Sequence, residues 1–155
     1  MSIWWSLHLR REAASVPLAR RLLLGTMETA GVDPDISFDL SLALTEACAN
    51  AVEHGGGPQQ GGPSGAYRVT AFLEGERCRI EVSDSGPGFP PGGRERQPAR
   101  PVAQDEAEHG RGLGLIRDLA DHASFGNRAG AAGGGAVVSF DKILKWRVDA
   151  PLVSA

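Results

Sequence analysis

The chain has 155 residues, of which 41% are hydrophobic, and its formal net charge is −3 at pH 7. A chain of this length fits one domain (1–155) that buries roughly 70% of the surface exposed by its unfolded state. The slightly acidic balance gives no indication of nucleic-acid binding. No apolar run reaches about 18 residues, and no basic region followed by an apolar stretch opens the chain, so we expect a cytoplasmic protein without a membrane segment. The two cysteines, Cys48 and Cys78, lack metal-ligand spacing and are expected to be small core residues.

The first half of the chain predicts one strand and two helices. Residues 2–10 alternate loosely and predict a strand. Leucines at helical spacing predict a first helix over 17–30, with a proline at its start and a glycine just beyond its end. A full apolar stripe predicts a second helix over 35–54, which a glycine–proline loop over 55–65 follows.

The second half of the chain predicts a hairpin, a long loop, a helix and a last strand. The segments are strands 66–74 and 77–83 joined by Gly75-Glu76, a loop over 85–112, a helix over 113–122, a candidate short strand near 123–127 and a strand over 136–144. This order favours an α+β protein, a two-layer α/β sandwich whose antiparallel or mixed sheet is covered on one face by helices.

Three polar residues, Glu46, Asn50 and His54, recur every four positions on the second predicted helix and form a line beside its apolar stripe. A carboxylate such as that of Glu46 can take a proton from a nucleophile, and the amide oxygen of Asn50 can coordinate Mg²⁺. The same spacing also occurs on the solvated face of ordinary amphipathic helices, so both interpretations stand at this point.

A second polar segment, Asp84-Ser85-Gly86-Pro87-Gly88-Phe89, directly follows a predicted strand. An Asp at a strand end can accept a hydrogen bond from an exocyclic amine such as that of adenine. The glycines allow a sharp turn and a close approach of the backbone to a flat ring. An ordinary Asp/Gly turn has the same composition.

The third segment, His109-Gly110-Arg111-Gly112-Leu113-Gly114-Leu115, opens the helix predicted over 113–122. Alternating glycines before a helix expose backbone N–H groups at its positive end, where an anion can bind. The segment does not match GxxxxGK[ST], which excludes a P-loop, and it does not follow a strand in a βαβ unit, which argues against a dinucleotide fingerprint. A glycine-rich connector is the alternative.

Together these segments carry a resemblance. EACANAVEHG (46–55), DSGPGF (84–89) and GRGLGL (110–115), in this order and spacing, resemble the N, G1 and G2 boxes of the GHKL ATPase superfamily, which implies a Bergerat-type ATP-binding fold. The chain is most similar to the anti-sigma factor and serine-protein kinase family of bacterial regulators, from about Trp5 to Leu144. The first strand and SVPLARRLLL favour this branch over the histidine-kinase catalytic domains.

The resemblance implies ATP and Mg²⁺ as cofactors and assigns roles to the matched positions. Asn50 would be the Mg²⁺ ligand and Glu46 the base that activates a substrate serine. Asp84 would hold the adenine amine, in a base pocket shaped by Gly86 and Gly88. The phosphates would be wrapped by Gly110, Arg111, Gly112, Leu113 and Gly114.

The resemblance also implies protein partners and a lid. Residues from about 90 to 112 would form the ATP lid, and residues 147–155 a tail without regular structure. Arg20 falls in a region similar to the family's partner-binding surface, although a solvated arginine lying over the core fits it equally well. The implied partners are a sigma factor and an anti-sigma factor antagonist, with a second copy of the chain as a homodimer.

Two departures from the family pattern bear on activity. Gly135-Ala136 stands where the family often has Gly-Thr, so one hydroxyl contact to the nucleotide region is missing, and the lid is rich in Pro and Arg. We therefore consider three functions. The chain is an anti-sigma factor that phosphorylates a serine of its antagonist, a nucleotide-dependent binding module without phosphoryl transfer, or a histidine-kinase-like domain acting on a separate phosphoacceptor.

Overall fold

A computed structural model describes residues 2–54, 65–86, 104–127 and 135–148, with the backbone alone for 104–111. The elements in chain order are β1 (Ser2–Arg10), α1 (Ser15–Ala30), α2 (Pro34–His54), β2 (Ala66–Glu74), β3 (Arg77–Asp84), α3 (Gln104–Leu119), β4 (His122–Asn127) and β5 (Ala136–Ile143). None of the helices in these ranges is long and apolar enough to cross a lipid bilayer.

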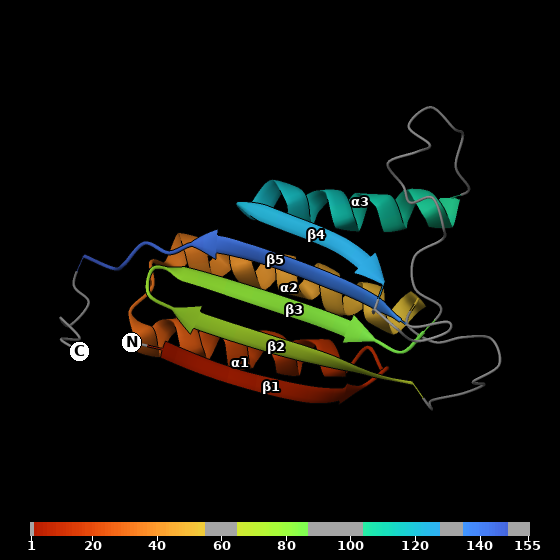
Figure 1. Cartoon of the computed structure of the whole chain (residues 1–155), viewed down its shortest axis with the longest axis horizontal. Helices are drawn as coiled ribbons and strands as arrows, with labels where there is room; N and C mark the ends of the chain where they lie inside the picture. The colour runs from red at the N-terminus through yellow and green to blue at the C-terminus, as the bar shows by residue number, and fades with distance from the viewer. Residues whose placement is uncertain (1, 55–64, 87–103, 128–134, 149–155) are drawn as a thin grey trace.

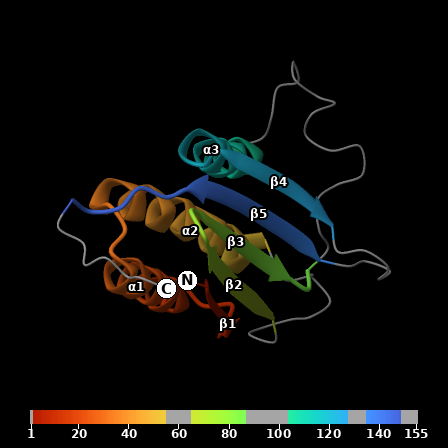
Figure 2. The same cartoon turned by 60° about the vertical axis from the view of Figure 1, so that its left-hand side comes forward.

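The five strands form one sheet in the order β1-β2-β3-β5-β4, and each neighbouring pair is antiparallel. The three helices lie on one face of this sheet, and no described element covers the other, which we call the uncovered face (Figure 1 and Figure 2). The two-layer α+β sandwich expected from the sequence is therefore confirmed. Its sheet is antiparallel throughout the described strands rather than mixed.

Helix α2 lies at the centre of the helical layer, where it packs against α1, α3 and the sheet. Its stripe of small and aliphatic residues is buried because the helix touches neighbours on three sides. In β2, side chains alternate between the buried face and the uncovered face, as the period of two in its sequence predicts. The same alternation continues in β3, so one core runs between the two layers.

Helix α3 begins earlier than the sequence predicts. We expected a helix over 113–122, whereas α3 spans Gln104–Leu119, so Gly110, Gly112 and Gly114 lie inside the helix rather than before it. The first half of α3 is polar and the helix contains three glycines, so its sequence lacks the regular spacing of apolar residues from which a helix is predicted. The predicted anion site at a helix N-terminus near residue 113 is therefore wrong.

The chain after β5 is fastened to the turn between α1 and α2. Asp33 donates its backbone N–H to the Lys145 carbonyl at 2.7 Å, and Arg147 donates to the Gly31 carbonyl at 2.8 Å. Gly31 ends α1 in the left-handed conformation, with φ of 83°. The rest of the predicted tail, 149–155, lies outside the described residues.

Both thiols and one phenol are held in the core as neutral groups. Burial raises the pKa of the Cys48 thiol from 9.0 to about 12, although a hydrogen bond with Tyr67 opposes the shift. Burial likewise raises the pKa of the Cys78 thiol from 9.0 to about 12, and the nearby Asp141 carboxylate adds to it. For Tyr67, burial raises the pKa from 10.0 to about 12.

We predict that the free energy of unfolding falls as pH rises from about 9 towards 12. At about pH 7 these groups are protonated in both states, whereas as pH passes through 9.0, the ordinary pKa of a thiol, the unfolded chain releases protons that the folded chain retains. Urea denaturation at about pH 7, 9 and 10.5 measures this loss. Cys78→Ala should show a shallower decline than the wild type, and a flat profile across this range would contradict the burial of the thiols.

Candidate functional site

The segments that carry polar residues meet at one end of the domain. The C-terminal ends of α2 and β3, the start of β5 and the N-terminal half of α3 all lie at the right-hand end in Figure 1. Close contacts join two pairs of these elements at this end, β3 with β5 and α2 with α3.

Asp84 is the last residue of β3 and is 6% exposed. Its Oδ1 accepts two backbone hydrogen bonds, from the Gly86 N–H at 2.9 Å and from the Ala136 N–H at 3.1 Å. The other oxygen, Oδ2, accepts no hydrogen bond from another described residue. A buried carboxylate fixed through one oxygen can accept a ligand's amine with the other.

Gly135 makes this arrangement possible because it passes directly over the end of β3. A Cβ at position 135 would lie 1.8 Å from the Asp84 carbonyl oxygen and 2.7 Å from its Oδ1. In the sequence, Gly135-Ala136 stands out only by the missing hydroxyl. The structure shows that Ala136 contributes through its backbone N–H, which any residue except proline supplies. A glycine directly before a strand was the available signal.

Glu46 lies against α3. A Cβ placed on Gly112 would be 3.4 Å from Glu46 Oε2, so the carboxylate faces the backbone of α3 at this glycine. Asn50 lies one turn further along α2, where side chains at i and i+4 are neighbours roughly 5–6 Å apart. Both residues are half-buried, and neither forms a hydrogen bond with another described side chain. The pair therefore presents a carboxylate and a neutral amide beside the glycine-bearing part of α3.

The donor set constrains any metal ion at this end of the domain. Within the described ranges, no group of three or more His, Cys, Asp or Glu side chains is placed to hold a cation. Mg²⁺ commonly keeps several waters and takes only one or two protein ligands together with substrate phosphates. Asn50 with phosphate oxygens and water fits this pattern.

Other predicted site residues are only partly defined. Gly88 and the lid residues up to 103 lie outside the described residues, and the side chain of Arg111 is not described. Gly86 is buried beside Asp84, and Gly114 lies within α3 with open space around its Cα. The Leu113 side chain is 3% exposed and belongs to the core, so only its backbone can face a ligand.

Arg20 lies on α1, on a different element from the residues above. It is half-exposed beside a shallow hollow of about 370 Å³ on the surface of α1. The structure therefore does not bring Arg20 together with the residues predicted to bind nucleotide.

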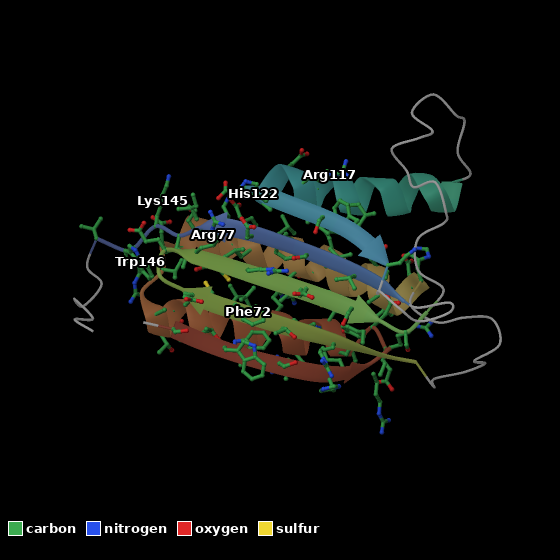
Figure 3. All side chains as sticks on the ribbon, viewed as in Figure 1. Phe72, Arg77, Arg117, His122, Lys145 and Trp146 are labelled. Atoms are coloured by element: carbon green, nitrogen blue, oxygen red, sulfur yellow. The ribbon has the colours of Figure 1, made fainter. Side chains whose placement is uncertain are left out.

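A broader hollow of about 790 Å³ lies on the uncovered face of the sheet and shares no residue with the predicted nucleotide segments. Phe72, Arg77 and His122 border it (Figure 3). His122 Nδ1 lies 2.9 Å from Asp141 Oδ1, and Arg79 forms an ion pair with Glu81 at 3.3 Å. We regard it as a solvated sheet face.

Arg11 holds the end of α2 in place and was missed by sequence reasoning. Its Nε donates to the Val52 carbonyl at 3.0 Å, and its backbone N–H donates to the Gly65 carbonyl at 3.1 Å. A Cβ on Gly65 would lie 2.8 Å from Arg11 Cδ. Arg11 therefore binds the last turn of α2 through its side chain and the residue directly before β2 through its backbone. The first of these bonds fixes the end of α2 just beyond Asn50. No sequence pattern marks a partner that is a backbone carbonyl.

Comparisons with known proteins agree on the architecture. The sequence profile of the histidine kinase-like ATPase domain family matches residues 9–142. A crystal structure of the RsbU and RsbW domains of Rv1364c from Mycobacterium tuberculosis superposes with a TM-score of 0.63 at 22% identity, covering 92% of this chain and 34% of that chain. The catalytic domain of histidine kinase ThkA gives a TM-score of 0.53 at 16% identity, covering 91% and 95%. No curated protein sequence matches. The chain thus spans about a third (34%) of the Rv1364c chain, and both likenesses concern the fold.

We predict that Gly135→Ala lowers the free energy of unfolding by about 1–3 kcal/mol, because its Cβ forces the start of β5 away from Asp84. The matched control is Gly126→Ala on β4, where a Cβ would meet nothing within 4 Å. Its effect should stay within about 0.5 kcal/mol. Urea denaturation of both variants measures the difference, and equal effects would mean that the contact between Gly135 and Asp84 is not tight.

Proposed function

Because this chain belongs to the histidine kinase-like ATPase domain family, we propose that it binds Mg·ATP between α2, α3 and the end of β3 and phosphorylates a serine of a regulatory protein. The observation that carries the proposal is the Glu46 carboxylate facing the backbone of α3 at Gly112, at the same end of the domain as the end of β3, where Asp84 is fixed through one oxygen (Figure 1). The ends of α2, β3, β5 and α3 that lie together supply a base, an amide ligand and an amine acceptor.

Each end of the nucleotide has its own set of residues in this proposal. Asp84 Oδ2 accepts a hydrogen bond from the adenine amine while Oδ1 keeps its two backbone donors. Gly86 and Gly88 leave room for the ring. Asn50 coordinates Mg²⁺, and the phosphates lie against the glycine-bearing part of α3, near Gly110, Arg111, Gly112 and Gly114.

Glu46 is the proposed general base. The serine Oγ forms a bond to the γ-phosphorus, the bond from that phosphorus to the bridging oxygen breaks, and ADP leaves. The Glu46 carboxylate receives the hydroxyl proton. In phosphoryl transfer most of the rate comes from positioning and charge stabilisation, so a carboxylate held on a rigid helix and packed against α3 suits this role.

The proposed protein partners are an anti-sigma factor antagonist, which carries the serine, and a sigma factor. Support comes from the resemblance of the boxes to the anti-sigma branch and from the fold shared with the structure that contains an RsbW domain. We further propose that Arg20, half-exposed on α1, contributes to partner binding.

A second candidate is a nucleotide-dependent binding module without phosphoryl transfer. Ala136 favours it, because this position offers a backbone N–H to Asp84 but no hydroxyl to the nucleotide. In such a module the same residues bind ATP, and only the role of Glu46 differs. A substitution of Glu46 therefore distinguishes the two functions, whereas a substitution of Asp84 affects ATP binding in both.

We predict that Asp84→Asn weakens binding of Mg·ATP by roughly ten- to a hundredfold, the loss of one hydrogen bond to a charged group of about 1.5–3 kcal/mol. The Asn side-chain oxygen can still accept from Gly86 and Ala136, so the melting temperature should change little. Isothermal titration measures the affinity, with Asp118→Asn on the exposed side of α3 as the control. Wild-type affinity in Asp84→Asn would place the adenine elsewhere.

We predict that Glu46→Gln slows transfer of label from radioactive ATP to a serine of the antagonist by about 10²–10⁴-fold and leaves ATP affinity within about threefold. Glu53→Gln, at an exposed position of the same helix, should transfer at the wild-type rate. Equal rates in wild type and Glu46→Gln would remove the base from the mechanism. ATP binding without labelled protein would favour the binding module, and acid-labile label would indicate a histidine acceptor.

A further inference from the structure

Three buried polar side chains form a chain of hydrogen bonds that the proposed mechanism does not use. Ser15 is 5% exposed and Tyr67 is 2% exposed, and their hydroxyl oxygens lie 2.5 Å apart. The Ser15 hydroxyl also donates to the Glu12 carbonyl at 2.7 Å, and the Tyr67 hydroxyl forms a hydrogen bond with the buried Cys48 thiol. The three side chains belong to α1, β2 and α2, so this chain of hydrogen bonds joins the sheet to two helices.

The direction of each hydrogen bond follows from the number of protons available. The Ser15 hydroxyl gives its one proton to the Glu12 carbonyl, so its oxygen is left to accept from Tyr67. Tyr67 thereby uses its own proton, and the Cys48 S–H is the donor to its oxygen. Each hydroxyl both donates and accepts, an arrangement in which neighbouring hydrogen bonds strengthen one another. Removal of the Tyr67 hydroxyl therefore breaks the chain of hydrogen bonds in its middle.

Helix α1 begins without a capping side chain. Ala14 occupies the N-cap position, where its side chain cannot accept a hydrogen bond, and the first turn contains no acidic residue. A helix end of this kind is less stable than one capped by Ser, Thr, Asp or Asn. Among the described residues, Tyr67 provides the only side-chain hydrogen bond that ties this turn to another helix or strand. The first turn of α1 can therefore exchange between a state held by Tyr67 and a frayed state.

Tyr67 also neighbours the proposed adenine site, because it is paired with Asp84 in the register of β2 and β3. Arg11 donates its N–H to the Gly65 carbonyl, so odd-numbered residues of β2 form their backbone hydrogen bonds with β1 and not with β3. Tyr67 and Asp84 are thus a non-hydrogen-bonded pair, the closer kind, with Cα atoms about 4.5 Å apart. The side chain that holds α1 lies directly beside the carboxylate to which we assign the adenine amine.

We propose that Tyr67 couples nucleotide binding at Asp84 to the first turn of α1, so that bound nucleotide favours the state in which this turn is held against the sheet. This inference rests on the proposed ATP-binding function and adds a form of regulation to the same site. The turn leads into the part of α1 where Pro17 and Arg20 line the shallow hollow described above. The surface to which we assign partner binding would therefore be ordered by the nucleotide.

The coupling requires a change in mobility and no large movement. An amine held by Asp84 restricts the end of β3 and the neighbouring Tyr67 ring. A ring with less freedom loses less entropy when its hydroxyl holds Ser15, so the held state of α1 becomes more populated. Such coupling is reciprocal, and a partner that binds the held state of α1 tightens the binding of nucleotide by the same factor.

Amide hydrogen exchange with and without saturating Mg·ATP tests this coupling, with mass spectrometry as the readout. In the wild type, Mg·ATP should slow exchange in residues 83–86 and also in residues 15–20, the latter by roughly three- to tenfold, as expected for about one hydrogen bond. In Tyr67→Phe the ring still fills the core, and Mg·ATP should still protect 83–86. Residues 15–20 of this variant should not respond to Mg·ATP, and without nucleotide they should exchange faster than in the wild type.

Three further variants separate the coupling from a general loss of stability. Ser15→Ala breaks the same hydrogen bond from the side of α1 and should also abolish the response of residues 15–20, whereas Ser15→Thr keeps a hydroxyl and should retain it. Thr70→Val is the matched control, because it removes one hydroxyl from the same strand, where Thr70 meets Ser6 at 3.2 Å. It should respond to Mg·ATP as the wild type does. The melting temperature of each variant checks that it is folded.

The two segments distinguish a failure of the coupling from a failure of the ATP site. Protection of 83–86 in the wild type without protection of 15–20 would overturn the coupling alone. So would a response of 15–20 that persists in both Tyr67→Phe and Ser15→Ala, because another contact would then hold the turn. An absence of protection at 83–86 would contradict the proposed ATP site, and the coupling would fall with it.

Discussion

Asp84 is a carboxylate with 6% exposure at the end of the central strand β3, and its Oδ1 accepts hydrogen bonds from two backbone N–H groups, one of Gly86 and one of Ala136. An unpaired buried carboxylate would be costly, whereas each hydrogen bond to a charged group returns about 1.5–3 kcal/mol. The two hydrogen bonds to Oδ1 thus offset the cost of burial and fix the side chain, while Oδ2 accepts no hydrogen bond from another described residue. In the proposed function, Oδ1 stabilises the buried side chain and Oδ2 recognises the nucleotide.

The antiparallel order of the sheet is what makes this arrangement possible. Because β5 runs antiparallel beside β3, the start of β5 lies next to the end of β3, and the Ala136 N–H reaches Asp84. Gly135 must pass over the strand end at a distance that no side chain allows. The C-terminal half of α2 lies at the same end, so residues distant in sequence converge there through topology rather than through a local motif (Figure 1).

Strand positions follow from local alternation, and β1 and β2 have the predicted bounds because each has one face on the core. Contacts to backbone carbonyls could not be predicted in this way. Arg11 bonds the Val52 carbonyl at 3.0 Å, and Lys142 bonds the Leu119 carbonyl at 2.7 Å while lying 3.8 Å from Asp39. Of these two residues, only Lys142 is marked by its sequence position, because it is a charged residue at an inward-facing position of β5.

The largest difference between the predicted and observed elements, the start of α3, occurs at the glycines to which we assign the phosphates. Each glycine inside a helix costs about 1 kcal/mol relative to alanine, so Gly110, Gly112 and Gly114 weaken α3 and disguise it. At Gly112 a Cβ would lie 3.4 Å from the Glu46 carboxylate, and a larger side chain would fill the space beside it. At the other end, Lys142 ties the last carbonyl of α3 to the sheet, which offsets part of this loss. Such a conflict between local propensity and observed structure is expected where function sets the sequence, and it lies beside the proposed base.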